Sequence, residues 1–182
     1  DMIATEQILK LLSAQKELNF ETGSQFGYCN SGYTLLAQIV KRVSGESFAE
    51  FTRKNIFIPL GMNNTLFNED VHQVIKNRAS SYELVKGRYQ EKRLNYSTAG
   101  ATSLTTTVED LAKWVANFEN PVVGNKDLIK NFNELSVYDN GKPVIWAARP
   151  GDTTYHAKGQ LHWKHKGLPV ISHGGHDAGF RA

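Results

Sequence analysis

The sequence is poor in several features that would place it in a special class of protein. It has one cysteine, Cys29, which excludes an internal disulfide. No apolar run approaches the roughly 20 residues that a membrane-spanning helix needs, so we expect no membrane span. The chain also has no internal repeat and no low-complexity segment. These absences leave a globular chain of 182 residues, a length typical of one domain.

An excess of charge of one sign is also missing from most of the chain. The formal net charge is +3, and the excess lies in residues 149–182, which hold five Lys or Arg, two Asp and five of the six histidines. These charges are scattered between apolar residues and form no run. We therefore expect no nucleic-acid partner.

The histidines of this last segment raise the question of a metal site. His162 and His165 have a spacing found in some metal sites. They fall on a β-rich segment and its turn, where their rings would diverge, and no acidic cluster joins them. The sequence therefore predicts neither a metal site nor another cofactor.

Hydrophobic periodicity changes along the chain from helical to strand-like. The C-terminal part has strand patterns from Thr153 to Trp163, from Leu168 to His173 and from Phe180 onward. A small hairpin is expected earlier in the chain, around Lys86-Gly87. Helical patterns come first and strand patterns second, which predicts an α+β fold with a mainly helical lobe over residues 1–150 and strands over 151–182. Helices are expected over residues 5–15, 31–44, 47–58, 107–119 and 126–135.

The stretch from Gly27 to Tyr33 leads into the clearest helical pattern of the chain, and the candidate site is built around it. Asn30 or Ser31 is a candidate cap, because a short polar side chain accepts from the free amides of the first turn. Cys29 is expected to point into the core. Tyr28 and Asn30 would then face a cleft from the mouth of an anchored helix. Its expected buried stripe is Leu35, Leu36, Ile39, Val40 and Val43.

Two further blocks follow this stretch in the chain. The first runs from Gly100-Ala101 through Leu104 and Thr106-Thr107 to Asp110-Leu111 and Lys113-Trp114, with Leu111, Trp114, Val115 and Phe118 expected as a buried stripe. The second is His173-Gly174-Gly175-x-x-x-Gly179-Phe180.

With Tyr28-Cys29-Asn30, these blocks resemble the serine β-lactamase and penicillin-binding-protein superfamily over nearly the whole chain. The most similar branch contains class C β-lactamases, D-aminopeptidases, DD-peptidases and family VIII esterases. The resemblance implies a β-lactamase/transpeptidase-like fold, a helical lobe with an antiparallel sheet. It also implies an acyl-enzyme mechanism on an amide, ester or β-lactam, a small-molecule or peptide substrate, and an extracytoplasmic location.

The resemblance assigns roles to individual residues. Tyr28 is the base or proton shuttle, and Asn30 orients a lysine and donates to a substrate carbonyl. His173 replaces the lysine of the family's third motif. Gly174 and Gly175 let a substrate backbone approach closely, and the amide of His176 is one oxyanion donor. Without the resemblance, Tyr28-Cys29-Asn30 would read as a helix entry and His173 as a strand histidine bonded to backbone.

The family's nucleophile motif, Ser-x-x-Lys, is the missing part. Ser13 and Lys16 have this spacing, but they lie close to Tyr28 in the chain and Ser13 falls near the exposed side of its helix. We interpret them as a chance match. The sequence is then expected to be an internal piece of a longer hydrolase, inactive alone, whose partner is the rest of its own fold.

Two alternatives stay open at this point. One is a non-catalytic relative that binds peptides or cell-wall fragments in the same cleft. The other is an interaction module in which the cleft is unused.

Overall fold

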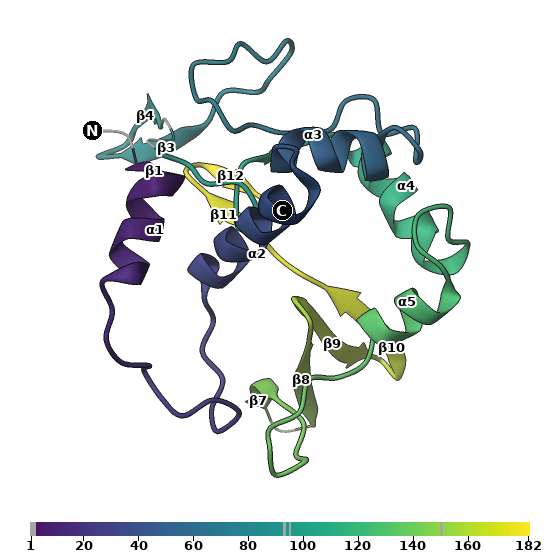
Figure 1. The fold of residues 1–182 in the computed structure, drawn as a ribbon. Helices are drawn as coiled ribbons and strands as arrows, with labels where there is room; N and C mark the ends of the chain where they lie inside the picture. Colours follow the sequence, from purple (N-terminus) through teal and green to yellow (C-terminus); the bar gives the residue numbers. More distant parts are fainter. Residues whose placement is uncertain (1–2, 93, 95, 150) are drawn as a thin grey trace. The chain divides into compact units, whose positions relative to one another are not determined.

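The computed structural model describes residues 3–92, 94, 96–149 and 151–182 (Figure 1). The chain divides into two compact units. We call them the helical unit (Asp1–Lys16, Cys29–Val123 and His176–Ala182) and the sheet unit (Glu17–Tyr28 and Gly124–Gly175). The division into residues 1–150 and 151–182 stays a prediction, and Pro150 at its boundary lies outside the described residues.

The helical unit contains most of the helices, and local signals set their ends. Gly45 adopts a left-handed conformation with φ 76° and closes the second helix. The Ser47 hydroxyl accepts from the Glu50 N–H at 3.1 Å, and the Thr107 hydroxyl accepts from the Asp110 N–H at 3.3 Å. These elements are α1 (Thr5–Ser13), α2 (Asn30–Ser44), α3 (Phe48–Thr52), the π-helix η1 (Arg53–Phe57) and α4 (Val108–Glu119).

Short strand pairs complete the helical unit. The expected hairpin at Lys86-Gly87 is present as the antiparallel pair β3–β4. The other pairs are β1–β5, which is parallel, and β2–β6 and β11–β12, which are antiparallel. The strands are β1 (Ile3–Ala4), β2 (Leu66–Phe67), β3 (Tyr82–Val85), β4 (Arg88–Glu91), β5 (Tyr96–Ser97), β6 (Leu104–Thr105), β11 (His176–Asp177) and β12 (Phe180–Arg181).

The sheet unit contains α5 (Lys126–Phe132) and an antiparallel sheet in the order β10-β9-β8-β7 (Figure 1). The strands β8 (Asp152–Ala157), β9 (Gln160–His165) and β10 (Leu168–Ser172) match the β-rich segments predicted from the sequence. The edge strand β7 (Ile145–Arg149) was not predicted. Its pairing with β8 is interrupted by a bulge between Ile145 and Ala147.

The start of α2 differs from the sequence-based prediction. Asn30 is the first helical residue and Cys29 is the cap position, with no side chain capping the first turn. Cys29 is exposed and does not point into a core. The expected cap and the expected burial of Cys29 are therefore both wrong.

The buried face of α2 also differs from the expected one. Thr34 and Ala37 are each 1% exposed, whereas Leu36, Ile39 and Val43 are 53%, 56% and 82% exposed. The periodicity correctly predicted a helix and an apolar stripe, but that stripe faces away from the elements that cover α2 in this unit. Burial depends on which neighbours reach a helix face, and periodicity alone cannot supply them.

Helix α4 likewise buries polar residues. Asp110 is 1% exposed and accepts from the Asn64 N–H (2.8 Å), the Thr65 hydroxyl (2.9 Å) and the Lys113 ammonium (2.8 Å). The bond from Lys113 is the main cause that holds the pKa of Asp110 below its ordinary value. Of the expected stripe, Val115 is 65% exposed. Asp110 thus fastens α4 to the turn before β2.

Candidate active site

An aromatic cluster in the sheet unit holds the segment that ends at Tyr28. The Tyr28 ring meets the Trp146 indole edge-on, with centroids 5.6 Å apart, and Phe26 contacts the same indole at 5.7 Å. Phe26 also contacts the His156 ring in a tilted geometry, with centroids 4.7 Å apart. Because Trp146 lies on β7 and His156 on β8, these contacts pin the segment before α2 to the sheet.

The same unit brings together two of the predicted catalytic residues. His173 follows β10, and its ring centroid lies 6.3 Å from that of Tyr28, with the planes inclined by 33°. Tyr28 is 56% exposed and His173 is exposed as well. The phenol is therefore held on one side by aromatic packing and is accessible to a reactant.

His156, which contacts Phe26 in the same cluster, is favoured as a neutral imidazole. Burial is the main cause that lowers the pKa of His156, and the nearby charge of His173 adds to it. The Gly159 N–H donates to His156 Nε2 at 3.4 Å, so Nε2 accepts. In the neutral ring Nδ1 then carries the proton and donates to the Ser136 hydroxyl, 3.2 Å away.

Asn30 and His176 belong to the helical unit, where they lie on different elements. Asn30 is exposed and begins α2. His176 begins β11 and pairs with Arg181 of β12. Asn30 lines a cavity of about 290 Å³ with Ile3, Ile8, Ser31, Thr34, Tyr96, Thr98 and Thr102.

Hydrogen bonds fasten the residues that follow His176 to Ser81, just before β3, and to Tyr96 of β5. The Gly179 N–H donates to the Ser81 hydroxyl at 2.6 Å, and the Tyr96 hydroxyl donates to the Asp177 carboxylate. Burial, together with the bond to this carboxylate, raises the pKa of Tyr96 to about 12. Tyr96 therefore stays protonated at neutral pH and serves as a donor that fixes β11.

The chain passes from one unit to the other inside two of the predicted motifs. One junction falls between Tyr28 and Cys29 and another between Gly175 and His176. Gly174 and Gly175 lie in the exposed link between β10 and β11. The structure thus brings the Tyr28 and His173 rings together. The roles of all six predicted site residues, Tyr28, Asn30, His173, Gly174, Gly175 and His176, stay predictions.

The Ser13–Lys16 pair lacks the geometry of a nucleophile motif. Helix α1 ends at Ser13, whose hydroxyl donates to the Lys10 carbonyl at 2.9 Å. Lys16 lies beyond the helix end. A lysine placed one helical turn from its serine requires an unbroken helix between them, and here that helix has stopped.

A metal site finds no support in the described ranges. No group of three His, Cys, Asp or Glu side chains among these residues could hold an ion. His162 and His165 lie three positions apart on β9, so they point to opposite faces of the sheet. Within the same ranges, no helix has the length and apolar character to cross a membrane.

The sequence did not reveal Phe26 and Trp146 as neighbours of the site. Trp146 lies on the one strand of the sheet that no pattern predicted, and Phe26 lies in a segment without periodicity. The concentration of aromatic residues next to Tyr28 was a signal, but only the fold shows which of them touch it.

Comparison with known proteins adds a second line of evidence. Residues 2–182 match the Beta-lactamase family. The serine beta-lactamase-like protein LACTB of Bos taurus mitochondria is 38% identical over 145 residues, which are 73% of this chain and 24% of that protein. D-aminopeptidase from Gluconobacter oxydans is 20% identical over 173 residues, 95% of this chain and 31% of that protein. The chain thus spans about a quarter to a third of these curated relatives.

Solved structures give the same answer for the fold. The octameric penicillin-binding protein homologue from Pyrococcus abyssi superposes with a TM-score of 0.80 at 26% identity, over 95% of this chain and 38% of that one. A penicillin-binding protein from Bacillus halodurans superposes with a TM-score of 0.79 at 20% identity, over 98% of this chain and 52% of that one. The β-lactamase/transpeptidase-like α+β fold expected from the motifs is confirmed, and the chain belongs to the Beta-lactamase family.

Proposed function

We propose that the intact protein is a serine hydrolase that cleaves an amide, an ester or a β-lactam through an acyl-enzyme. The observation that carries the proposal is the pairing of an exposed Tyr28 with His173 in one unit of a Beta-lactamase-family chain. Several similar proteins are named for amide cleavage: D-aminopeptidase, D-stereospecific amidohydrolase from Streptomyces and D-amino acid amidase from Ochrobactrum anthropi. An amide of a small molecule or peptide is therefore the first substrate class to test.

In the proposed mechanism Tyr28 moves a proton. A serine supplied by a part of the protein outside this chain attacks the carbonyl carbon, and Tyr28 takes the hydroxyl proton. The resulting oxyanion is stabilised by amide donors, one of them the N–H of His176. The tetrahedral intermediate then collapses, the carbon–leaving-group bond breaks, and the proton passes to the leaving group. Water then attacks the acyl carbon while Tyr28 takes a proton from it. The second tetrahedral intermediate collapses, the ester bond to the serine breaks, and the proton passes to the serine oxygen.

His173 and Asn30 assist this proton transfer in the proposal. A phenol is a useful base only where a neighbouring cation stabilises the phenolate. The His173 ring, 6.3 Å from Tyr28 between centroids, supplies such a charge when it is protonated. Asn30, at the first position of α2, would orient the lysine of the nucleophile motif and donate to the substrate carbonyl.

The test is covalent labelling of the intact protein by a fluorophosphonate, which phosphonylates a reactive serine, and, separately, by a penicillin, which acylates it. Intact-mass measurement and peptide mapping follow. We expect one adduct, on a serine of a Ser-x-x-Lys motif outside this chain. Tyr28→Phe should slow the acylation by about a hundredfold, the lower range for loss of a general base. Tyr89→Phe is the matched control, because Tyr89 is an exposed tyrosine on β4.

Other outcomes separate the alternatives. An adduct on Ser13 would contradict the proposed source of the nucleophile. Unchanged acylation in Tyr28→Phe would remove the phenol from the mechanism. If neither probe reacts and a peptide or cell-wall fragment still binds, the protein is the non-catalytic relative that the sequence left open.

A further inference from the structure

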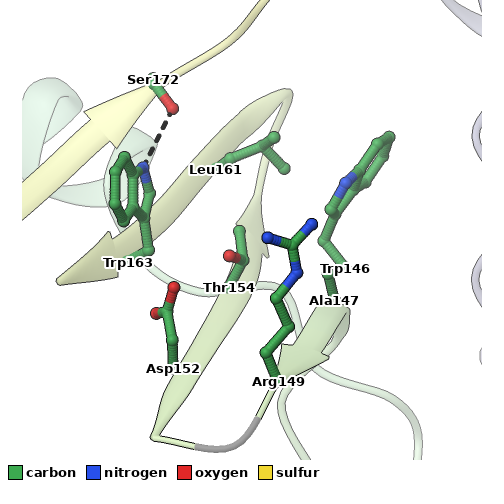
Figure 2. A pocket seen from close by; sticks show the side chains of 8 residues that line it. All are labelled: Trp146, Ala147, Arg149, Asp152, Thr154, Leu161, Trp163 and Ser172. Atoms are coloured by element: carbon green, nitrogen blue, oxygen red, sulfur yellow. Dashed lines mark hydrogen bonds between the residues drawn. The ribbon is translucent and has the colours of Figure 1, made fainter. Parts of the chain in front are cut away.

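A second cavity lies on the sheet unit alone, on one face of β7–β10 (Figure 2). Its volume is about 270 Å³, near the lower limit of about 300 Å³ for pockets that take drug-sized ligands, so it suits a smaller molecule. The lining side chains come from all four strands of the sheet. They are Trp146, Ala147, Arg149, Asp152, Thr154, Leu161, Trp163 and Ser172.

Two opposite charges line this cavity without being joined to each other. Arg149 of β7 and Asp152 of β8 are direct partners in the antiparallel register, so both side chains rise from one face. Figure 2 shows them on either side of Thr154. Among the residues that the structure describes, neither side chain forms an ion pair. The guanidinium and the carboxylate are thus both available to a ligand.

The remaining walls are apolar and aromatic. Trp146 stands near the Arg149 side and Trp163 near the Asp152 side in Figure 2, with Leu161 between them. The Trp163 indole N–H donates to the Ser172 hydroxyl at 3.3 Å, which fixes the ring plane. An aromatic face beside a carboxylate favours a bound ammonium, and the Arg fork favours a bound carboxylate.

We propose that this cavity binds a free α-amino acid with an apolar or aromatic side chain, in its zwitterionic form. The ligand's carboxylate pairs with Arg149, its ammonium with Asp152 and the face of Trp163, and its side chain packs against Trp146 and Leu161. A zwitterion pairs with both charges of the cavity at once. A simple anion would be repelled by Asp152, and a simple cation would be repelled by Arg149. This site is separate from the proton-transfer site at Tyr28, although Trp146 contacts both.

The test is titration calorimetry of the intact protein with L- and D-phenylalanine. Two analogues each lack one charge: 3-phenylpropanoate has no ammonium and 2-phenylethylamine has no carboxylate. We expect phenylalanine to bind at least about tenfold more tightly than either analogue, since each lost charged hydrogen bond costs affinity on that scale. Binding is measured without turnover, so this result does not depend on the proposed hydrolase activity.

Variants locate the binding. Arg149→Met and Asp152→Asn should each weaken phenylalanine binding by about tenfold or more. Arg88→Met on β4 and Asp127→Asn on α5 are the matched controls and should leave it unchanged. The proposal is overturned if phenylalanine does not bind, which is also the outcome if the rest of the intact protein covers this face. It is equally overturned if phenylalanine binds with the same affinity in both cavity variants.

Discussion

The Tyr28 phenol ring packs edge-on against the Trp146 indole, with centroids 5.6 Å apart and planes at 88°. Edge-to-face packing is a favourable geometry for two aromatic rings and contributes about 0.5–1.5 kcal/mol beyond the area it buries. Tyr28 is otherwise largely exposed. Trp146 is therefore the main restraint on the ring that the proposed mechanism uses for proton transfer.

Removing that restraint should impair the proposed reaction. In the intact protein, Trp146→Ala should lower kcat about three- to tenfold, the loss that corresponds to one aromatic pair. Trp146→Phe should keep most of the activity because a ring remains. Trp163→Ala is the control, since Trp163 lines the neighbouring cavity but has no ring contact with Tyr28. Equal losses of kcat in Trp146→Ala and Trp163→Ala would contradict a positioning role for Trp146.

The Asp110 carboxylate is expected to be a major source of stability. Asp110→Ala should lower the free energy of unfolding by about 3 kcal/mol, because it leaves buried donors from the turn at Asn64-Thr65 without an acceptor. Urea denaturation measures the change. Glu109→Ala, at the exposed neighbouring position of α4, is the control and should cost less than about 1 kcal/mol. Comparable losses in the two variants would show that the buried network is not what stabilises α4.

Stability should fall on mild acidification because of His156. Burial lowers the pKa of His156 below its ordinary 6.5, so the unfolded chain takes up this proton before the folded one does. The contribution is present above about pH 6.5 and is lost as the pH falls through the lower pKa of the folded state. His156→Gln should flatten this part of the curve of unfolding free energy against pH, whereas His165→Gln on β9 should not. An unchanged slope in His156→Gln would assign the acid sensitivity to another group.

Gly100 is required by a close approach to α2. It has a φ of 104°, and a Cβ there would collide with the Tyr33 carbonyl oxygen and lie 2.9 Å from the Ala37 Cβ. Gly100→Ala should therefore cost about 2–4 kcal/mol from backbone strain and overpacking together. Gly141 also has a positive φ of 76° but open space around it, so Gly141→Ala should cost only about 1 kcal/mol. Equal costs in thermal unfolding would mean that the packing against α2 is loose.

Local signals in the sequence were good guides to where elements begin and end. The Ser47 and Thr107 hydroxyls cap their helices, and Gly45 closes α2. These features depend on hydrogen bonds between residues a few positions apart, so the sequence contains the necessary information. The family could also be predicted, because its motifs are short and occur in a set order, and the match over residues 2–182 confirms it.

Which faces are buried could not be predicted in the same way. The apolar stripe of α2 is largely exposed while Thr34 and Ala37 are buried, and α4 buries Asp110. Periodicity identifies a helix from its own residues, but burial is decided by segments that arrive from elsewhere in the chain. The extracytoplasmic location expected from the resemblance stays a prediction.

The sequence by itself determined the family, the order of the motifs and most of the regular elements, because each rests on residue identities at short spacing. Tertiary structure alone decided that Phe26 and Trp146 hold Tyr28, and that His173 comes within ring contact of it. It also decided that Arg149 and Asp152 share a cavity with two tryptophans. The contacts of Tyr28 with Trp146 and His173 join residues far apart in the chain. The cavity forms only when strand register places side chains of four strands on one face.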